Sequence, residues 1–407
     1  MLSPGEEPRM NDGNDTRVMV SLLKRGYAAV FFNNWPVWLG GLLIGILSVI
    51  TFAWARPWGV AGGLRNWGDW FFSLVGLYGR PPLSPLLSTS SILTGGLLWG
   101  AFGAALMSRQ FAIRMAPPLE LAKGIVGGGL MGIGAAMAGG CNVGGFYSAV
   151  SALSAGGLAM MAGLFTGAYL GLRYIYWELE HLPSGSTGGT RGKKEGGFNW
   201  LKVEPYAGAA VFVLAAVCAA LYARQALTRI GGLLLCGIAF GVIIQRCRFC
   251  FVRGFRDPFM TGDGEISRAI AVSVIVSVLG FAALKWTGLR GETVYVTRTF
   301  WFGSLVGGIV FGFGMVMAGG CGSGSVWRAG EGQVKLILAV ICFSLSTSLF
   351  KTWIRSSEGF SSLMGKRVFL PWFLTYKWTL ILVIVIFLLY YLVATWNEET
   401  EKFVVEM

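Results

Sequence analysis

Histidine is almost absent from this sequence: His181 is the only one among 407 residues. Zinc sites, haem proteins and most catalytic triads depend on histidine, so we expect no metal site and no cofactor. Charged residues are also scarce, at 13% against about a quarter in soluble domains. Hydrophobic residues make up 54% of the chain. This balance indicates a membrane protein.

Two familiar sequence signals are missing as well. The chain has no GxxxxGK[ST] run, which argues against a P-loop ATP site. The first 35 residues are polar and basic, without the short apolar core and the cleavage site of a signal peptide. We therefore predict a basic cytoplasmic segment over residues 1–35, with an amphipathic surface helix from Val18 to Phe32.

Long apolar runs fill the rest of the chain. A membrane-spanning helix needs about 20 apolar residues, and ten segments meet this requirement. We therefore predict an all-α, polytopic membrane protein with one transmembrane transporter domain over residues 36–407, embedded in the lipid bilayer. Residues 67–78 and 144–150 are apolar but short, which suggests re-entrant or interfacial segments. The predicted spans are 36–56, 90–108, 119–138, 152–172, 204–223, 229–246, 269–287, 299–318, 332–353 and 371–395.

The net charge of +13 would suit a nucleic-acid partner, but the basic residues lie between the apolar runs and not in one patch. We therefore expect no nucleic acid. The excess of Lys and Arg in the loops of one side follows the positive-inside rule and favours a cytoplasmic N-terminus. The stretch over residues 178–202, rich in Gly, Ser and Lys, has the composition of a flexible linker between two halves.

An internal repeat ends twice on a thiol. The pentapeptide Met-Ala-Gly-Gly-Cys closes at Cys141 and again at Cys321. Aligned at an offset of 180 residues, the segments 127–141 and 307–321 agree at nine of fifteen positions. Two halves of the chain are therefore related.

The direction of the two halves follows from counting spans. A weaker match pairs residues 95–103 with 231–241, and we predict a first repeat over about 90–175 and a second over about 229–345. Five crossings separate the ends of the third and eighth predicted spans, an odd number, so the repeats are inverted. Inverted repeats with glycine-broken apolar segments are typical of transporters that bind their substrate near the membrane midplane.

Each Gly-Gly-Cys turn is expected to leave its helix, because glycine tolerates unwound backbone. The amide groups of residues 141–145 and 321–325 would then form anion-binding nests. Asn142 either orients a substrate or caps a short helix, and the pattern leaves both open. The alternative for the glycines is close packing of helices in lipid. The candidate substrate-site residues from these turns are Gly140, Cys141, Asn142, Gly320, Cys321 and Gly322.

The other cysteines give a weaker signal. Cys218, Cys236 and Cys342 lie inside uniformly apolar runs, where a free cysteine packs as a small hydrophobe, and we assign them no function. Cys247 and Cys250 form a lone CxxC. Zinc would need two more ligands than this pair supplies, so we expect one of these thiols to face a cavity and the other to pack.

Several motifs carry a resemblance to a known family, namely QRCRFCFVRGFRD, AGGCNVGGFYSA and GGIVFGFGMVMAGGCGSGSVWRAGEGQ. They closely resemble the YeeE/YedE family of bacterial membrane proteins, which is associated with uptake of thiosulfate and other sulfur compounds. The resemblance covers roughly residues 90–175 and 229–345. Because the first 85 residues and the linker fall outside it, the chain is similar to the longer YedE-like branch, some members of which are associated with selenium metabolism.

This resemblance implies a path on which three thiols pass thiosulfate across the membrane. The family's cysteine positions match Cys141, Cys250 and Cys321, whereas Cys247 stands where the family usually has another residue. A neutral thiol donates a weak hydrogen bond, and weak successive sites suit conduction, since the substrate must leave as readily as it enters.

Arginines near these cysteines suit an anion. Arg253 and Arg256 follow Cys250, and Arg328 follows Cys321 by seven residues. We count Arg256 and Arg328 among the candidate substrate-binding residues, because they would raise the local anion concentration at the cytoplasmic mouth. Positive-inside bias explains Arg253 equally well.

We therefore expect a permease of the bacterial inner membrane, not an enzyme, that imports thiosulfate or a related small sulfur-containing anion. The resemblance suggests a cytoplasmic sulfur-carrier protein as a partner. Three alternatives stay open: transport of a selenium compound, a membrane sulfurtransferase whose three cysteines carry persulfide, and an anchor for a redox complex. Passive and ion-coupled movement are both open.

Overall fold

The computed structural model describes residues 25–79, 81–181 and 200–405. Within these ranges ten helices are long and apolar enough to cross a membrane, which confirms the all-α polytopic class. Most of the predicted helix over 18–32 and of the predicted linker lies outside the described residues. The helices that cross are α2 (Val37–Trp54), α4 (Thr89–Met107), α5 (Pro118–Ala138), α7 (Ala155–His181), α8 (Trp200–Arg224), α9 (Thr228–Cys247), α11 (Glu265–Trp286), α12 (Phe302–Ala318), α14 (Val334–Ser356) and α16 (Tyr376–Thr400).

Short helices lie between these spans. Three spans are broken: α5 continues into η2 and α6, α9 continues into α10, and α12 continues into α13. The two short apolar segments seen in the sequence correspond to α3 and to η2 with α6. The short elements are η1 (Ala28–Phe32), α3 (Ala61–Leu74), η2 (Asn142–Tyr147), α6 (Ser148–Ser151), α10 (Phe251–Met260), α13 (Gly322–Gly330), α15 (Glu358–Leu363) and η3 (Leu370–Trp372).

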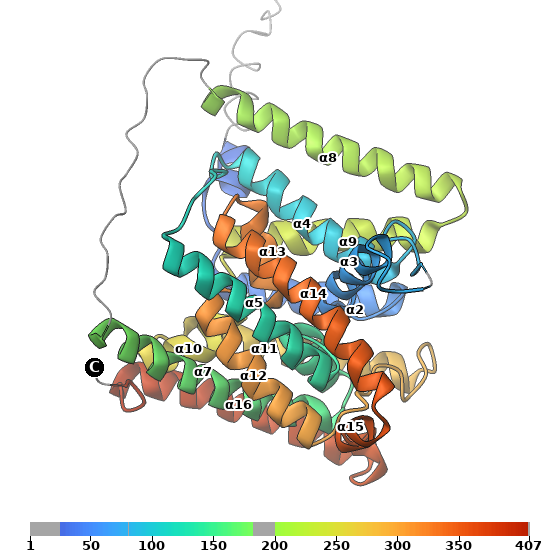
Figure 1. Ribbon diagram of the computed structural model, residues 1–407, viewed down its shortest axis with the longest axis vertical. Helices are drawn as coiled ribbons and strands as arrows, with labels where there is room; N and C mark the ends of the chain where they lie inside the picture. The colour runs from blue at the N-terminus through green and yellow to red at the C-terminus, as the bar shows by residue number, and fades with distance from the viewer. Residues whose placement is uncertain (1–24, 80, 182–199, 406–407) are drawn as a thin grey trace, which may run out of the picture.

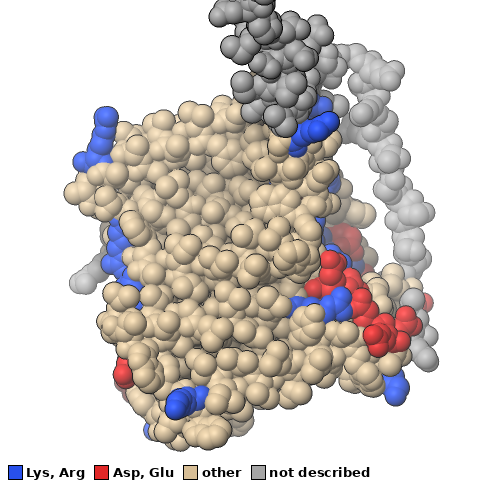
Figure 2. Space-filling view, turned by 180° about the vertical axis from the view of Figure 1, so that it is seen from behind, with Lys and Arg blue, Asp and Glu red and all other residues tan. Residues whose placement is uncertain are grey.

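The distribution of charge on the surface is that of a protein embedded in a bilayer. Figure 2 shows a broad band of uncharged surface between margins that carry Lys, Arg, Asp and Glu. Helices α8 and α16 lie at opposite ends of the bundle (Figure 1), and few residues of either helix are buried. Because apolar side chains at such positions need a hydrocarbon environment, these two helices face lipid.

Contacts between helices fall into matched pairs. The contact of α4 with α9 corresponds to the contact of α11 with α2. In the same way, the contact of α5 with α14 corresponds to the contact of α12 with α7. Helix α8 covers α4 as α16 covers α11. The pattern matches α2–α8 with α9–α16, two units of five spans each. An odd number of spans gives the two units opposite directions in the membrane.

This packing pattern reinterprets one feature of the sequence. Residues 95–103 on α4 and 231–241 on α9 resemble each other, but α4 matches α11 in the packing and α9 matches α2. The two segments are alike because both present glycines to a shared interface: a Cβ atom at Gly96 would lie 2.7 Å from Leu234 O, and one at Gly237 would lie 2.5 Å from Leu93 O. The repeat limits of 90–175 and 229–345 stay a prediction.

Helices α5 and α12 cross at the centre through glycine. A Cβ atom at Gly127 would lie 2.6 Å from Gly314 O, and one at Gly134 would lie 2.5 Å from Gly307 O. Such separations leave no room for a side chain, so these glycines serve close packing of backbones. The paired residue numbers rise along α5 as they fall along α12, so the two helices cross antiparallel.

Candidate functional site

Both repeat helices end in the same turn. Gly139 and Gly319 each adopt left-handed backbone, with φ of 77° at both, a conformation that glycine adopts without strain and that ends helices. The following cysteines are extended, with φ of −73° at Cys141 and −78° at Cys321. A short helix starts directly after each of them, η2 after Cys141 and α13 after Cys321. The repeat in sequence is therefore a repeat in backbone conformation.

The third candidate cysteine stands at the third break. Arg248 adopts left-handed backbone, with φ of 52°, and ends α9. Cys250 is extended and precedes the first residue of α10. All three candidate cysteines are buried. Each therefore stands at the start of a short helix inside a broken span.

The structure brings the three cysteines together around the first turn of α13. A Cβ atom at Gly324 would lie 3.0 Å from Cys250 Sγ and 3.0 Å from Cys321 Sγ. A Cβ atom at Gly322 would lie 3.1 Å from Cys141 Cβ. Side chains from three spans and both halves thus meet at one place in the bundle.

Polar groups line the same place. The Gly322 N–H donates to Asn142 Oδ1 at 3.2 Å, and the Gly324 N–H donates to Cys321 Sγ at 3.2 Å. Asn142 therefore caps α13. Its amide nitrogen Nδ2 is buried without a hydrogen-bond partner in the described part of the chain, as is Ser325 Oγ. Buried polar groups without partners are rare, and these can still bind a ligand.

The two glycines before the cysteines keep the turns tight. A Cβ atom at Gly140 would lie 2.5 Å from the amide nitrogen of Gly145, and one at Gly320 would lie 2.9 Å from Ser325 Oγ. Any larger residue would push the short helix away from the cysteine that precedes it. Gly140 and Gly320 thus shape the site rather than present a binding group.

Sequence reasoning missed Trp58, which lies between α2 and α3. Its side chain is 1% exposed, stacks on Phe240 with ring centroids 4.3 Å apart, and lies edge-on to Tyr147 at 5.7 Å. Its indole Nε1 is another buried donor without a partner among the described residues. No motif marked it, because its segment falls outside the Gly-Gly-Cys repeat.

The two candidate arginines differ. Arg328 donates to Gly319 O at 2.9 Å, at the end of α12, and its guanidinium lies over the Trp327 ring, 5.2 Å from the centroid. Arg256 donates to Asp257 Oδ1 at 2.7 and 3.0 Å. A carboxylate therefore offsets the charge of Arg256, whereas Arg328 holds the backbone turn that precedes Cys321.

The CxxC is not a working pair in this structure. A Cβ atom at Gly40 would lie 2.6 Å from Cys247 Sγ, so Cys247 packs against α2, whereas Cys250 faces α13. The remaining cysteines, Cys218, Cys236 and Cys342, are half-buried.

Glu331, which follows α13, forms an ion pair with Arg248. Glu331 is fully buried and accepts hydrogen bonds from Arg248 Nη1 at 2.8 and 3.0 Å and from Gln245 Nε2 at 2.9 Å. The network links the break between α9 and α10 to the end of α13. Sequence reasoning did not single out Arg248 or Gln245.

Broken spans from two inverted units, with buried donors that lack a partner among the described residues where the units meet, are typical of a membrane transporter. The sequence model of a family described as sulphur transport matches residues 13–170 and 246–406. The chain belongs to this sulphur transport family, the YeeE/YedE family. The resemblance seen in its motifs is thereby confirmed.

Individual relatives agree with this assignment. A protein named probable transporter YedE from Escherichia coli K12 is 27% identical over 307 residues, which cover 71% of this chain and 74% of that protein. Its counterpart of the same name in Salmonella typhimurium is 27% identical over 308 residues, with the same coverage. The thiosulfate transporter TsuA of Escherichia coli is 34% identical over 120 residues, which cover 29% of this chain and 33% of that protein. These names point to a transporter and not to an enzyme.

Proposed function

We propose that this protein imports thiosulfate, or a related small sulfur-containing anion, across the bacterial inner membrane along a path lined by Cys141, Cys250 and Cys321. The observation that carries the proposal is the meeting of these three cysteines around the first turn of α13. Each comes from a different broken span, so the meeting unites the two inverted units.

The chemistry of the site suits the two ends of thiosulfate. Its terminal sulfur is soft and polarizable, and a thiol offers it a weak S–H donor. Its oxygens need hydrogen bonds when they leave water, and the unpartnered Asn142 Nδ2, Ser325 Oγ and Trp58 Nε1 are suitable donors. Several weak contacts in series allow the ion to move on.

The direction of import depends on the orientation of the chain. We place the N-terminus in the cytoplasm because the positive-inside rule favours it. Ten spans then return the C-terminus to the same side, and α7 and α16 both end on the left of Figure 1. In this orientation the Arg248–Glu331 pair lies at the cytoplasmic end of the path, and Arg56 lies at the outer end.

The comparisons support the substrate class. Relatives of this chain include proteins named for thiosulfate transport, and the longer matches are to probable transporters. A cytoplasmic sulfur-carrier partner stays a prediction, as does transport of a selenium compound.

Growth on thiosulfate as sole sulfur source tests the proposal. The chain is expressed in a bacterial strain that lacks thiosulfate uptake, and its presence in the membrane is checked by immunoblot. We expect growth, together with uptake of radiolabelled thiosulfate into proteoliposomes that hold the purified protein. Membrane-inserted protein with neither growth nor uptake would refute it, and a parallel selenite assay measures the alternative substrate.

A further inference from the structure

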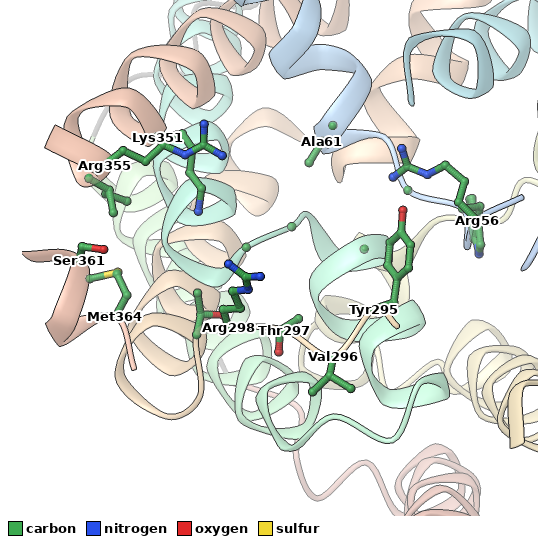
Figure 3. Close-up of a pocket in the computed structure, with 18 residues that line it drawn as sticks. Arg56, Ala61, Tyr295, Val296, Thr297, Arg298, Lys351, Arg355, Ser361 and Met364 are labelled. Atoms are coloured by element: carbon green, nitrogen blue, oxygen red, sulfur yellow. The ribbon is translucent and has the colours of Figure 1, made fainter. Parts of the chain in front are cut away.

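A cavity of about 520 Å³ opens at the Arg56 end of the bundle. Its walls come from the break between α2 and α3, from the loop that precedes α12, and from α14 and α15 (Figure 3). Gly140 and Gly144 line it, so it reaches the turn that holds Cys141. Neither the motifs nor the repeat pointed to this cavity.

The lining is strongly cationic. Arg56, Arg298, Lys351 and Arg355 all line the cavity, and no Asp or Glu does so among the described lining residues. None of these four takes part in an ion pair within the described part of the chain. Like charges gathered in one cavity repel one another and attract anions.

The cations face the cavity from opposite sides. Figure 3 shows the Lys351 ammonium group and the Arg298 guanidinium group pointing toward one another, from α14 and from the loop before α12. Lys351 also donates to Ala136 O at 3.1 Å, which anchors it near the end of α5. Arg298 and Arg355 are exposed. An ion between these groups would be contacted from both walls.

Tyr295 adds a neutral donor. Figure 3 shows its hydroxyl pointing into the cavity on the Arg56 side, and the Arg56 guanidinium lies 5.5 Å from the centroid of its ring. Burial raises the pKa of Tyr295, so its hydroxyl stays protonated. Its φ of 65° is unusual for a residue other than glycine, and such strain concentrates at functional sites.

The floor of the cavity differs from its walls. We call the part of the lining beside the turn of Cys141 the floor; it includes Gly139, Gly140 and Gly144, and Cys141 follows Gly140 in the chain. The walls offer charge and hydrogen bonds, which suit any tetrahedral dianion. The thiols beyond the floor offer soft contacts, which suit only an anion with a terminal sulfur.

We propose that the cavity is a separate binding site for tetrahedral dianions, sulfate included, and that selection for sulfur takes place only at the thiols beyond it. The transport part of this inference rests on the proposed function. The binding part stands on the cavity alone. Sulfate therefore occupies the cavity and competes with thiosulfate but is not carried across.

Binding and uptake are measured on the full chain in nanodiscs and proteoliposomes. We expect sulfate to inhibit thiosulfate uptake competitively, with no uptake of radiolabelled sulfate. Arg298→Gln and Lys351→Gln together should raise the thiosulfate concentration for half-maximal uptake and the sulfate concentration for half-inhibition in parallel, by about tenfold, with an unchanged maximal rate. Lys366→Gln, an exposed cation on the same side that does not line the cavity, should change neither.

Two further measurements keep the outcomes distinct. Arg298→Gln alone leaves the Lys351 bond to α5 intact, so this single variant still tests the cavity if the double variant folds poorly. Cys141→Ser should abolish uptake yet still bind sulfate. The inference is wrong if sulfate neither binds nor competes. It is also wrong if Arg298→Gln leaves the thiosulfate concentration for half-maximal uptake and the sulfate concentration for half-inhibition at their wild-type values. Neither result would contradict thiosulfate import. Cation-dependent sulfate binding by a chain that carries no thiosulfate supports the cavity and removes the import function.

Discussion

Asn142 and Gly322 stand at equivalent positions of the repeat, 180 residues apart, and bind each other: Asn142 Oδ1 accepts the Gly322 N–H at 3.2 Å. Equivalent positions of two related units touch only where the two-fold axis passes between them. The glycine crossing of α5 and α12 lies about the same axis. The cysteine site is therefore at the centre of the internal symmetry, where both units contribute residues to it.

The first prediction concerns the thiols. Serine at Cys141, Cys250 or Cys321 keeps the size of the side chain nearly unchanged but replaces a soft sulfur with a hard oxygen. Each variant should lose thiosulfate uptake in proteoliposomes. Cys218→Ser and Cys342→Ser, which alter half-buried cysteines away from the site, should keep it, and equal uptake by all five variants would rule out recognition by thiols.

Gly324 should tolerate no side chain. Its alanine variant places a Cβ atom 3.0 Å from both Cys250 Sγ and Cys321 Sγ, and overpacking of this kind costs about 1–3 kcal/mol. We expect Gly324→Ala to reduce uptake and the melting temperature together. Gly129→Ala is the matched control, because a Cβ atom at Gly129 meets nothing within 4 Å. Normal uptake by Gly324→Ala would show that the thiols are not confined as described.

Asn142 caps α13 in the structure, and the proposed function gives it a second role as a donor to the substrate. Asn142→Asp keeps an oxygen that accepts the Gly322 N–H but removes the Nδ2 donor and adds negative charge. Uptake should fall by about tenfold or more, since one hydrogen bond to a charged group contributes about 1.5–3 kcal/mol. The melting temperature should change little. A large loss of stability with retained uptake per folded molecule would mean that Asn142 acts only as a cap.

The buried pair of Glu331 and Arg248 should matter for stability. Glu331→Gln removes the negative charge that two hydrogen bonds from Arg248 satisfy. Because the Arg248 side chain keeps 33% exposure, water relieves part of the penalty, and we expect a loss of about 2 kcal/mol. Thermal unfolding in detergent measures it. Glu399→Gln, at an exposed position on α16, should leave the unfolding temperature unchanged.

Topology gives the last prediction. A reporter that fluoresces only in the cytoplasm should be active when fused to either end of the chain, because ten spans return the C-terminus to the starting side. The same reporter inserted after Gly291, in the loop before α12, should be dark. Fluorescence from the inserted reporter, with none from either terminal fusion, would show that the chain has the opposite orientation. The proposed direction of transport would then be reversed.

The fold was largely readable from the chain. Each of the ten spans depends on about 20 consecutive residues, so hydropathy located most of their ends to within a few residues, although α7, predicted to end at residue 172, runs to His181. The Gly-Gly-Cys turns were also readable, because the helix end at Gly139 and at Gly319 is a local property of glycine. Cys141 and Cys321 were singled out for the same reason, whereas Cys250 was chosen over Cys247 only through the resemblance to the family.

The surroundings of those cysteines were decided in three dimensions. Trp58, the Arg248–Glu331 pair and the cations of the outer cavity come from segments far apart in the chain, and their meeting depends on how α2, α9 and α14 pack. Hydropathy and local motifs carry no information about such pairings. Glu331 illustrates this point, because its partner Arg248 lies 83 residues away in the chain.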